Sequence, residues 1–114
     1  MRKKIIDNET VYVGTGNVFA DLGLPNPEEH LLKAKLMHAI NTDIAKRNIT
    51  QEEAANLLGL KQPELSRIAN GHSAGFSVER LIDILRNLGH DVEIVVSQGH
   101  HSIGELRFWN GPPL

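Results

Sequence analysis

The stretch TQEEAANLLGLKQPELSRIANG, residues 50–71, decides the fold, because several local rules for two short helices agree within it. Thr50 followed three positions later by Glu53 forms a T-x-x-E capping box, which starts a helix. Gly59 suits the left-handed backbone conformation that ends a helix at low cost. The stretch therefore predicts a short first helix that stops in a glycine turn.

A second helix is predicted directly after that turn. Pro63 is tolerated only in the first turn of a helix, so we expect the helix to begin near Gln62 and to stop at Asn70-Gly71. Small and apolar residues recur where two such helices would touch, namely Ala54, Ala55, Leu57, Leu58, Leu60, Leu65 and Ile68. This layout is that of a helix-turn-helix, whose second helix enters the DNA major groove. An ordinary helical hairpin in a bundle shares the apolar spacing and is the alternative.

The stretch resembles the Xre/Cro-type helix-turn-helix family, to which the lambdoid phage repressors belong. The matching residues include the T-Q opening, the L-G of the turn, the S-R-I of the second helix and the closing N-G. The resemblance implies that Gln51 contacts a phosphate and braces Gln62, and that Gln62 reads adenine through its amide. The DNA-binding positions implied in this way are Gln51, Lys61, Gln62, Pro63, Ser66, Arg67 and Asn70.

Two residues depart from the family pattern. Lys61 stands where a Ser or Thr cap is usual, so the second helix loses a hydroxyl cap and gains a cation that can bind phosphate. Pro63 removes a side-chain donor at a position that often reads bases. Part of the sequence specificity is therefore expected to lie elsewhere in the helix.

The flanking sequence predicts further helices that complete a mainly α, lambda-repressor-like helical bundle over residues 26–90. Asn26-Pro27 followed by Glu28-Glu29 starts a helix that runs to about Arg47. Ser77 caps another, and Gly89 ends it. The expected buried stripes are Leu32, Leu36, Ala39, Ile40 and Ile44 in the first helix, and Leu81, Ile84, Leu85 and Leu88 in the last.

Composition sets limits on the function. The chain has 114 residues, a net charge of −2 and no cysteine, which suits one domain without disulfides or thiolate metal sites. DNA-binding domains are often basic, so this balance opposes tight non-specific DNA binding. Basic residues nevertheless gather in the helical middle: Lys33, Lys35, Lys46, Arg47, Lys61, Arg67, Arg80 and Arg86. No apolar run has the length of a membrane span and no secretory signal is evident, so we expect a cytoplasmic protein.

Residues 91–98 break the helical pattern, since the β-branched run DVEIVVS predicts a short C-terminal strand. A single strand needs a partner, which could be the early segment around Thr10–Val13 or the same strand of a second subunit. We expect a homodimer on a palindromic operator, because DNA readers of this size usually bind two half-sites. The dimerisation residues predicted are Val92, Ile94, Val95 and Val96.

The N-terminal extension, residues 1–25, contains the second distinctive patch. Asn17 can cap a short helical turn, and the apolar residues Val18, Phe19 and Leu22 either pack on the chain's own helices or bind a partner. Residues 17–97 as a whole resemble the small Xre-family antitoxins of HigA type. That resemblance implies repression of the protein's own operon and neutralisation of a RelE/HigB-like ribonuclease toxin.

The remaining features predict no catalytic or metal site. His100-His101 lack the spacing of a metal motif, and no nucleophile is placed beside a base, so we expect neither an enzyme nor a cofactor. The tail, residues 99–114, is irregular in composition but contains Ile103, Leu106, Phe108 and Trp109. It could be a disordered end, a further strand over 105–109, or an arm that packs on a second subunit.

Overall fold

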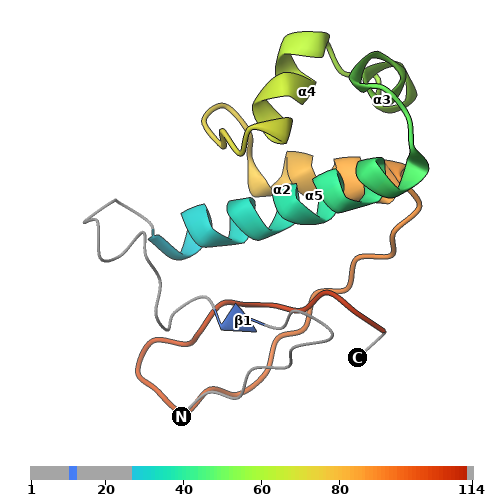
Figure 1. Ribbon diagram of the computed structural model, residues 1–114. Coiled ribbons are helices and arrows are strands. Elements are labelled where there is room, and N and C mark those ends of the chain that lie inside the picture. Colours follow the sequence, from blue (N-terminus) through green and yellow to red (C-terminus); the bar gives the residue numbers. More distant parts are fainter. Residues whose placement is uncertain (1–10, 13–26, 113–114) are drawn as a thin grey trace. The chain divides into compact units, whose positions relative to one another are not determined.

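A computed structural model describes residues 11–12 and 27–112, which form four helices and two short strands (Figure 1). The chain divides into two units: one is residues 33–92, and the other comprises residues 1–32 and 93–114. The elements are β1 (Val11–Tyr12), α2 (Pro27–Arg47), α3 (Gln51–Leu58), α4 (Gln62–Ala69), α5 (Val78–Asn87) and β2 (Arg107–Phe108). The predicted mainly α fold with a helix-turn-helix is confirmed, and a short strand near the C-terminus lies at Arg107–Phe108.

The ends of α3 follow the predicted local chemistry. The Thr50 hydroxyl accepts the N–H of Glu53 at 3.1 Å, and the Glu53 carboxylate accepts the N–H of Thr50 at 2.9 Å. Gly59 ends the helix with φ at +65°, where a side chain would be strained. The capping box and the glycine turn therefore both form as the sequence predicts.

The boundaries of α2 and α5 were also predictable. The first helix begins at Pro27 with two acidic residues in its first turn, and it ends at Arg47. The Ser77 hydroxyl caps α5 by accepting the N–H of Arg80 at 3.0 Å. Beyond that helix, the N–H of His90 reaches the carbonyl of Leu85 at 3.1 Å, which closes the C-terminal turn through Gly89.

The core of residues 33–92 draws on all four helices. Its buried members are Leu36, Met37, Ala39, Ile40, Ala54, Ala55, Leu58, Leu65, Ile68, Phe76, Leu81, Ile84, Leu85 and Leu88. Each buried Leu or Ile contributes roughly 1.5–3 kcal/mol through its removal from water. Two corrections concern the predicted stripes: Leu57 is 52% exposed, because it lies on the solvent face of α3, and Met37 is buried although the spacing did not single it out.

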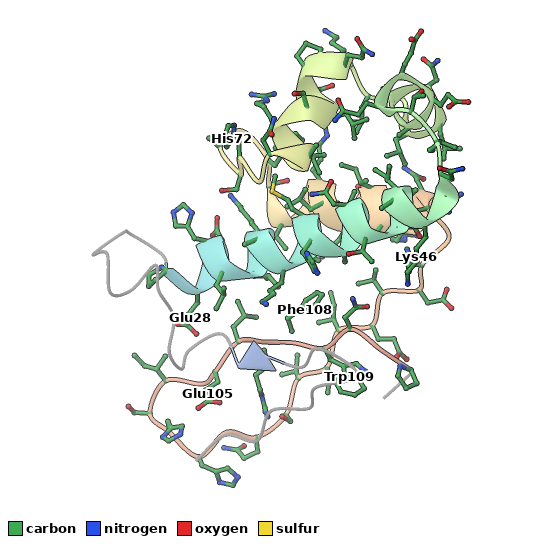
Figure 2. The ribbon with its side chains drawn as sticks, viewed as in Figure 1. Glu28, Lys46, His72, Glu105, Phe108 and Trp109 are labelled. Carbon is green, nitrogen blue, oxygen red and sulfur yellow. The ribbon has the colours of Figure 1, made fainter. Side chains whose placement is uncertain are left out.

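In the other unit, β1 and β2 form a two-stranded antiparallel sheet. Val11 pairs with Phe108, and Tyr12 pairs with Arg107. Figure 2 shows Phe108 and Trp109 in this C-terminal stretch, and the Trp109 indole donates to the carbonyl of Pro112 at 2.7 Å. Of the three alternatives left open for the tail, a further strand within residues 105–109 is the one that forms, over Arg107–Phe108.

The predicted strand at 91–98 is wrong for the single chain. Residues 91–98 lack regular structure and are exposed, and within the described part of the chain β1 pairs with β2 instead of with this segment. Their backbone groups therefore lack the intrachain ladder that a strand requires. The exposed apolar side chains include Ile94 at 80% and Val96 at 92%.

The predicted helical turn with Val18, Phe19 and Leu22 lies outside the described residues. Among the helices that are described, none has the length and apolar character needed to cross a lipid bilayer.

Candidate nucleic-acid interface

The turn between α3 and α4 (Figure 1) is held by a small apolar cluster of side chains. Ala54, Ala55 and Leu65 are buried together, and Leu60 packs against them from the turn. Ala55 is only 3% exposed, so the close approach of the two helices depends on its short side chain. The N–H of Leu60 also reaches the carbonyl of Ala55 at 2.9 Å. The angle between α3 and α4 is therefore fixed by packing and by the backbone.

A side chain of α2 anchors the far end of α4. The amide nitrogen of Asn41 donates to the carbonyl oxygen of Ile68 at 2.9 Å, in a partly buried position. The Ile68 carbonyl also accepts the N–H of Gly71 at 3.0 Å, so Asn41 supplies it with a further partner from another helix. Because Ile68 is itself fully buried, α4 is attached to the rest of the unit at its C-terminal turn by both packing and hydrogen bonding.

The N-terminus of α4 is capped without a hydroxyl. Lys61 occupies the cap position, and Glu64 Oε1 accepts the N–H of Lys61 at 3.0 Å. The second oxygen of Glu64 accepts a hydrogen bond from Arg80 of α5 at 2.9 Å. The bond from the Lys61 N–H, and the charge and bond of Arg80, hold the pKa of Glu64 below its ordinary value. The carboxylate half of a capping box is thus present, while the N–H of Glu64, which a Ser or Thr hydroxyl would accept, bonds the carbonyl of Lys61 at 3.0 Å.

The exposed face of α4 carries the residues expected to meet DNA. Lys61, Gln62 and Pro63 are exposed in or just before the first turn, and Ser66 is half-buried one turn later. In a helix-turn-helix, these first residues of the second helix lie deepest in the major groove. The structure therefore brings four of the seven predicted DNA-binding residues to one end of α4.

Arg67 has a defined position in the last turn of α4, beside the loop between α4 and α5. Its guanidinium carbon lies 5.4 Å from the centroid of the buried Phe76 ring, a distance at which a cation is attracted to an aromatic face. A Cβ on Gly75 would lie 3.5 Å from Arg67 Nη1, so the guanidinium also contacts this loop. Figure 2 labels His72 in the same loop.

Asn70 and Gln51 have different surroundings. The Asn70 amide donates to the carbonyl of Ser66 at 2.9 Å, so this side chain closes the last turn of its own helix. Gln51 is the first residue of α3 and is exposed. The amide nitrogen of Asn70 is therefore used within its own helix and leaves its side-chain oxygen as an acceptor for other contacts, whereas Gln51 keeps its amide in solvent.

Acidic partners reduce the positive face expected from the sequence. Arg47 is paired with Asp43, Arg80 with Glu64 and, more loosely, Arg86 with Asp83 at 3.5 Å. Because each of these arginines is paired with a carboxylate, it attracts DNA phosphates less strongly. A modest positive face is also what a net charge of −2 leads one to expect. Lys46 lies near the C-terminal end of α2 (Figure 2).

Asp43 is the centre of a second polar cluster, at the C-terminal ends of α2 and α5. Its carboxylate contacts Arg47 and lies 2.6 Å from His90 Nε2, and Arg47 also donates to the carbonyl of Leu88 at 2.6 Å. Burial opposes ionisation of Asp43, but the bonds and charges of Arg47 and His90 outweigh it and lower its pKa. This cluster fixes the point at which residues 91–98 leave the helical unit.

The comparisons with known proteins agree with this geometry. The helix-turn-helix domain family matches residues 18–97, which is more than half of the chain. The chain belongs to this helix-turn-helix family. A solved structure provisionally described as an XRE family transcriptional regulator is 39% identical, with a TM-score of 0.66, and the match covers 74% of this chain and 94% of that one. The XRE-type helix-turn-helix protein is thus a DNA-binding transcriptional regulator by family. No curated protein matches the chain.

Several residues that position the interface of this XRE-type protein were not identified from the sequence. Asn41, Phe76 and Arg80 act on α4 from other elements, and their partners are 9 to 27 positions away in the chain, as for Asn41 and Ile68 with a separation of 27. Glu64 could have been found, because K-x-x-E keeps the acidic half of a capping box. Phe76 directly precedes the Ser77 cap and has the spacing of a hydrophobic staple with Leu81, which predicts its burial but not its contact with Arg67. Asn41 and Arg80 carry no local pattern that distinguishes them from ordinary helix residues.

Proposed function

We propose that this XRE-type protein is a sequence-specific DNA-binding repressor that acts as a homodimer and represses its own gene. The observation that carries the proposal is the capped first turn of α4, which presents Gln62 to solvent beside Lys61. A glutamine amide can bond both N6 and N7 on the major-groove edge of adenine, and a lysine can neutralise a phosphate. The proposed role is non-catalytic and cytoplasmic.

The dimer is proposed because one copy offers too little positive charge. With three arginines of the helical unit paired to acids, a single copy neutralises few phosphates. Two linked copies multiply their weak half-site affinities, since the second binding event becomes intramolecular. The exposed apolar segment 92–96 supplies a surface for pairing, and strands from two copies would satisfy each other's backbone groups.

The finer part of the proposal is an antitoxin role. It rests on the resemblance of residues 17–97 to Xre-family antitoxins of HigA type, and it assigns Val18, Phe19 and Leu22 to a RelE/HigB-like toxin. The neighbouring gene tests this role. A short, basic reading frame beside this gene whose product arrests growth, and whose arrest is relieved by co-expression of this protein, would support it. A neighbouring product without toxicity would leave a stand-alone regulator.

Binding to the DNA upstream of its own gene tests the repressor role. In a gel-shift titration at moderate salt, the protein should bind this fragment at concentrations that leave a shuffled fragment of equal length unbound. Equal binding to the two fragments would contradict sequence-specific repression. It would favour the alternative, a protein-interaction module in which the helix-turn-helix is structural.

A further inference from the structure

Arg80 joins the first turn of α5 to the first turn of α4. Its Nη2 lies 2.9 Å from Glu64 Oε2, while Glu64 Oε1 accepts the N–H of Lys61 at 3.0 Å. One carboxylate therefore divides its two oxygens between the cap of α4 and the neighbouring helix. A carboxylate bound only to the cap could rotate about its side-chain torsions, and the bond from Arg80 restricts that rotation.

The Arg80 side chain is itself held from a second side. Its guanidinium carbon lies 5.8 Å from the centroid of the Phe76 ring, which is 2% exposed and belongs to the core. Its backbone N–H is bonded to the Ser77 cap at 3.0 Å, which sets the direction in which the side chain leaves α5. The Phe76 ring, the Ser77 cap and the ion pair with Glu64 therefore together restrict the position of the Arg80 side chain.

We propose that Arg80 is a positioning residue for DNA reading, which holds Glu64 against the N–H of Lys61 and so orients the first turn of α4. That turn carries Gln62, whose amide must meet a base edge with correct distance and angle. The inference rests on the proposed function, since orientation of α4 matters only if α4 reads bases. An exposed ion pair by itself stabilises little, so the effect of Arg80 is on DNA recognition more than on folding.

The competing role for Arg80 is a direct phosphate contact, because its side chain is 45% exposed. Salt dependence separates the two roles. Each phosphate contact contributes about 0.9 to the slope of log affinity against log salt, and a residue that only positions α4 contributes nothing to it.

The test uses the full chain and two kinds of duplex: one selected by the wild-type protein from a random pool, and a shuffled version of it. Arg80→Met is compared with Arg86→Met, which removes one positive charge from the same helix. We expect Arg80→Met to weaken binding to the selected duplex about three- to tenfold more than Arg86→Met does. Both variants should bind the shuffled duplex equally and show the same salt slope.

A second arm asks whether Arg80 acts through Glu64. In a Glu64→Ala background, Arg80→Met should cause no further loss of affinity for the selected duplex, because the link to the cap is already broken. Arg80→Lys, which keeps a cation near Glu64, should recover most of the affinity. Circular dichroism identifies any variant that does not fold, and Arg80→Gln replaces Arg80→Met if that variant is unfolded.

Several outcomes would overturn the inference. If the slope of log affinity against log salt is smaller in magnitude by about one for Arg80→Met than for Arg86→Met, Arg80 contacts a phosphate. Equal losses for the two arginine variants, or additive losses with Glu64→Ala, would show that Arg80 does not position α4. A wild-type protein that enriches no sequence from the pool would overturn the proposed function, and the inference with it, and that result is distinct from the others.

Discussion

The side-chain amide of Asn41, on α2, donates a hydrogen bond of 2.9 Å to the carbonyl oxygen of Ile68, near the end of α4. At the other end of α4, the N–H of Lys61 donates to the Glu64 carboxylate at 3.0 Å, within the first turn of the helix itself. Of these two contacts, only Asn41 comes from outside the helix-turn-helix, so α2 contributes directly to the geometry of α4.

Removal of the Asn41 amide should therefore destabilise the protein. We expect Asn41→Ala to lower the free energy of unfolding by about 0.5–1.5 kcal/mol relative to a matched control, because a partly buried bond is lost. Asn56→Ala is the control, since it makes the same change at an exposed position of α3 and so has the same gain in helix propensity. Urea unfolding measures both; equal stabilities would show that the Asn41 bond contributes nothing.

Gly59, in the turn between α3 and α4, should tolerate a side chain poorly for backbone reasons alone. Its φ is +65°, and a Cβ there would meet nothing within 4 Å, so only conformational strain opposes substitution. Gly59→Ala should cost about 1 kcal/mol in thermal or urea unfolding, and Gly59→Asn should cost less because Asn tolerates the left-handed region. An alanine variant as stable as the wild type would rule out this strain.

Stability should fall in acid partly through Asp43. Its pKa in the folded protein lies below the ordinary value of 3.8, so the carboxylate stabilises the fold above that pH and loses its effect as the pH falls through the folded-state pKa. Unfolding free energies measured from about pH 6 to pH 3 should therefore decline less steeply for Asp43→Asn than for the wild type. Arg47→Met removes the main partner of Asp43, so its unfolding free energy should also decline less steeply than that of the wild type as the pH falls. Parallel curves for all three proteins would refute the assignment.

The segment 92–96 should be required for dimerisation. In an extended conformation, Val92, Ile94 and Val96 lie on one face and Ser97 lies on the other. Ile94→Asp should convert a dimer into a monomer in analytical ultracentrifugation, because it places a charge in the centre of the apolar face. Ser97→Asp adds the same charge on the opposite face and should leave the dimer intact. A wild-type protein that is monomeric at all accessible concentrations would contradict the proposed pairing.

The sequence predicted the helices well because their ends depend on nearby residues. Thr50 with Glu53, and Ser77 with the N–H of Arg80, are bonds across three positions, and such bonds are visible as spacing. The exposure of Leu57 was not predicted, because the apolar residues of α3 span a wider face than the face that contacts its neighbours. The burial of Met37 was not predicted, because the buried face of α2 is wider than its stripe of apolar residues three or four positions apart.

The predictions that failed or were missing depend on distant partners. The strand at 91–98 was predicted from its β-branched residues, and its candidate partner within the chain, the segment around Thr10–Val13, pairs with residues 107–108 instead. The residues that hold α4 from outside, Asn41 and Arg80, were missed because nothing in their local sequence marks them. The DNA-binding and dimerisation residues remain predictions, which the DNA-binding titrations and analytical ultracentrifugation test.

The central claim is that α4 reads DNA sequence through Gln62, and paired titrations of two neighbouring variants test it most directly. Dissociation constants of Gln62→Ala and Lys61→Ala are measured on the operator duplex and on a shuffled duplex at one salt concentration. We predict that Gln62→Ala loses about 1–3 kcal/mol on the operator and almost nothing on shuffled DNA, whereas Lys61→Ala weakens both equally. Equal losses on the two duplexes for Gln62→Ala would contradict the account.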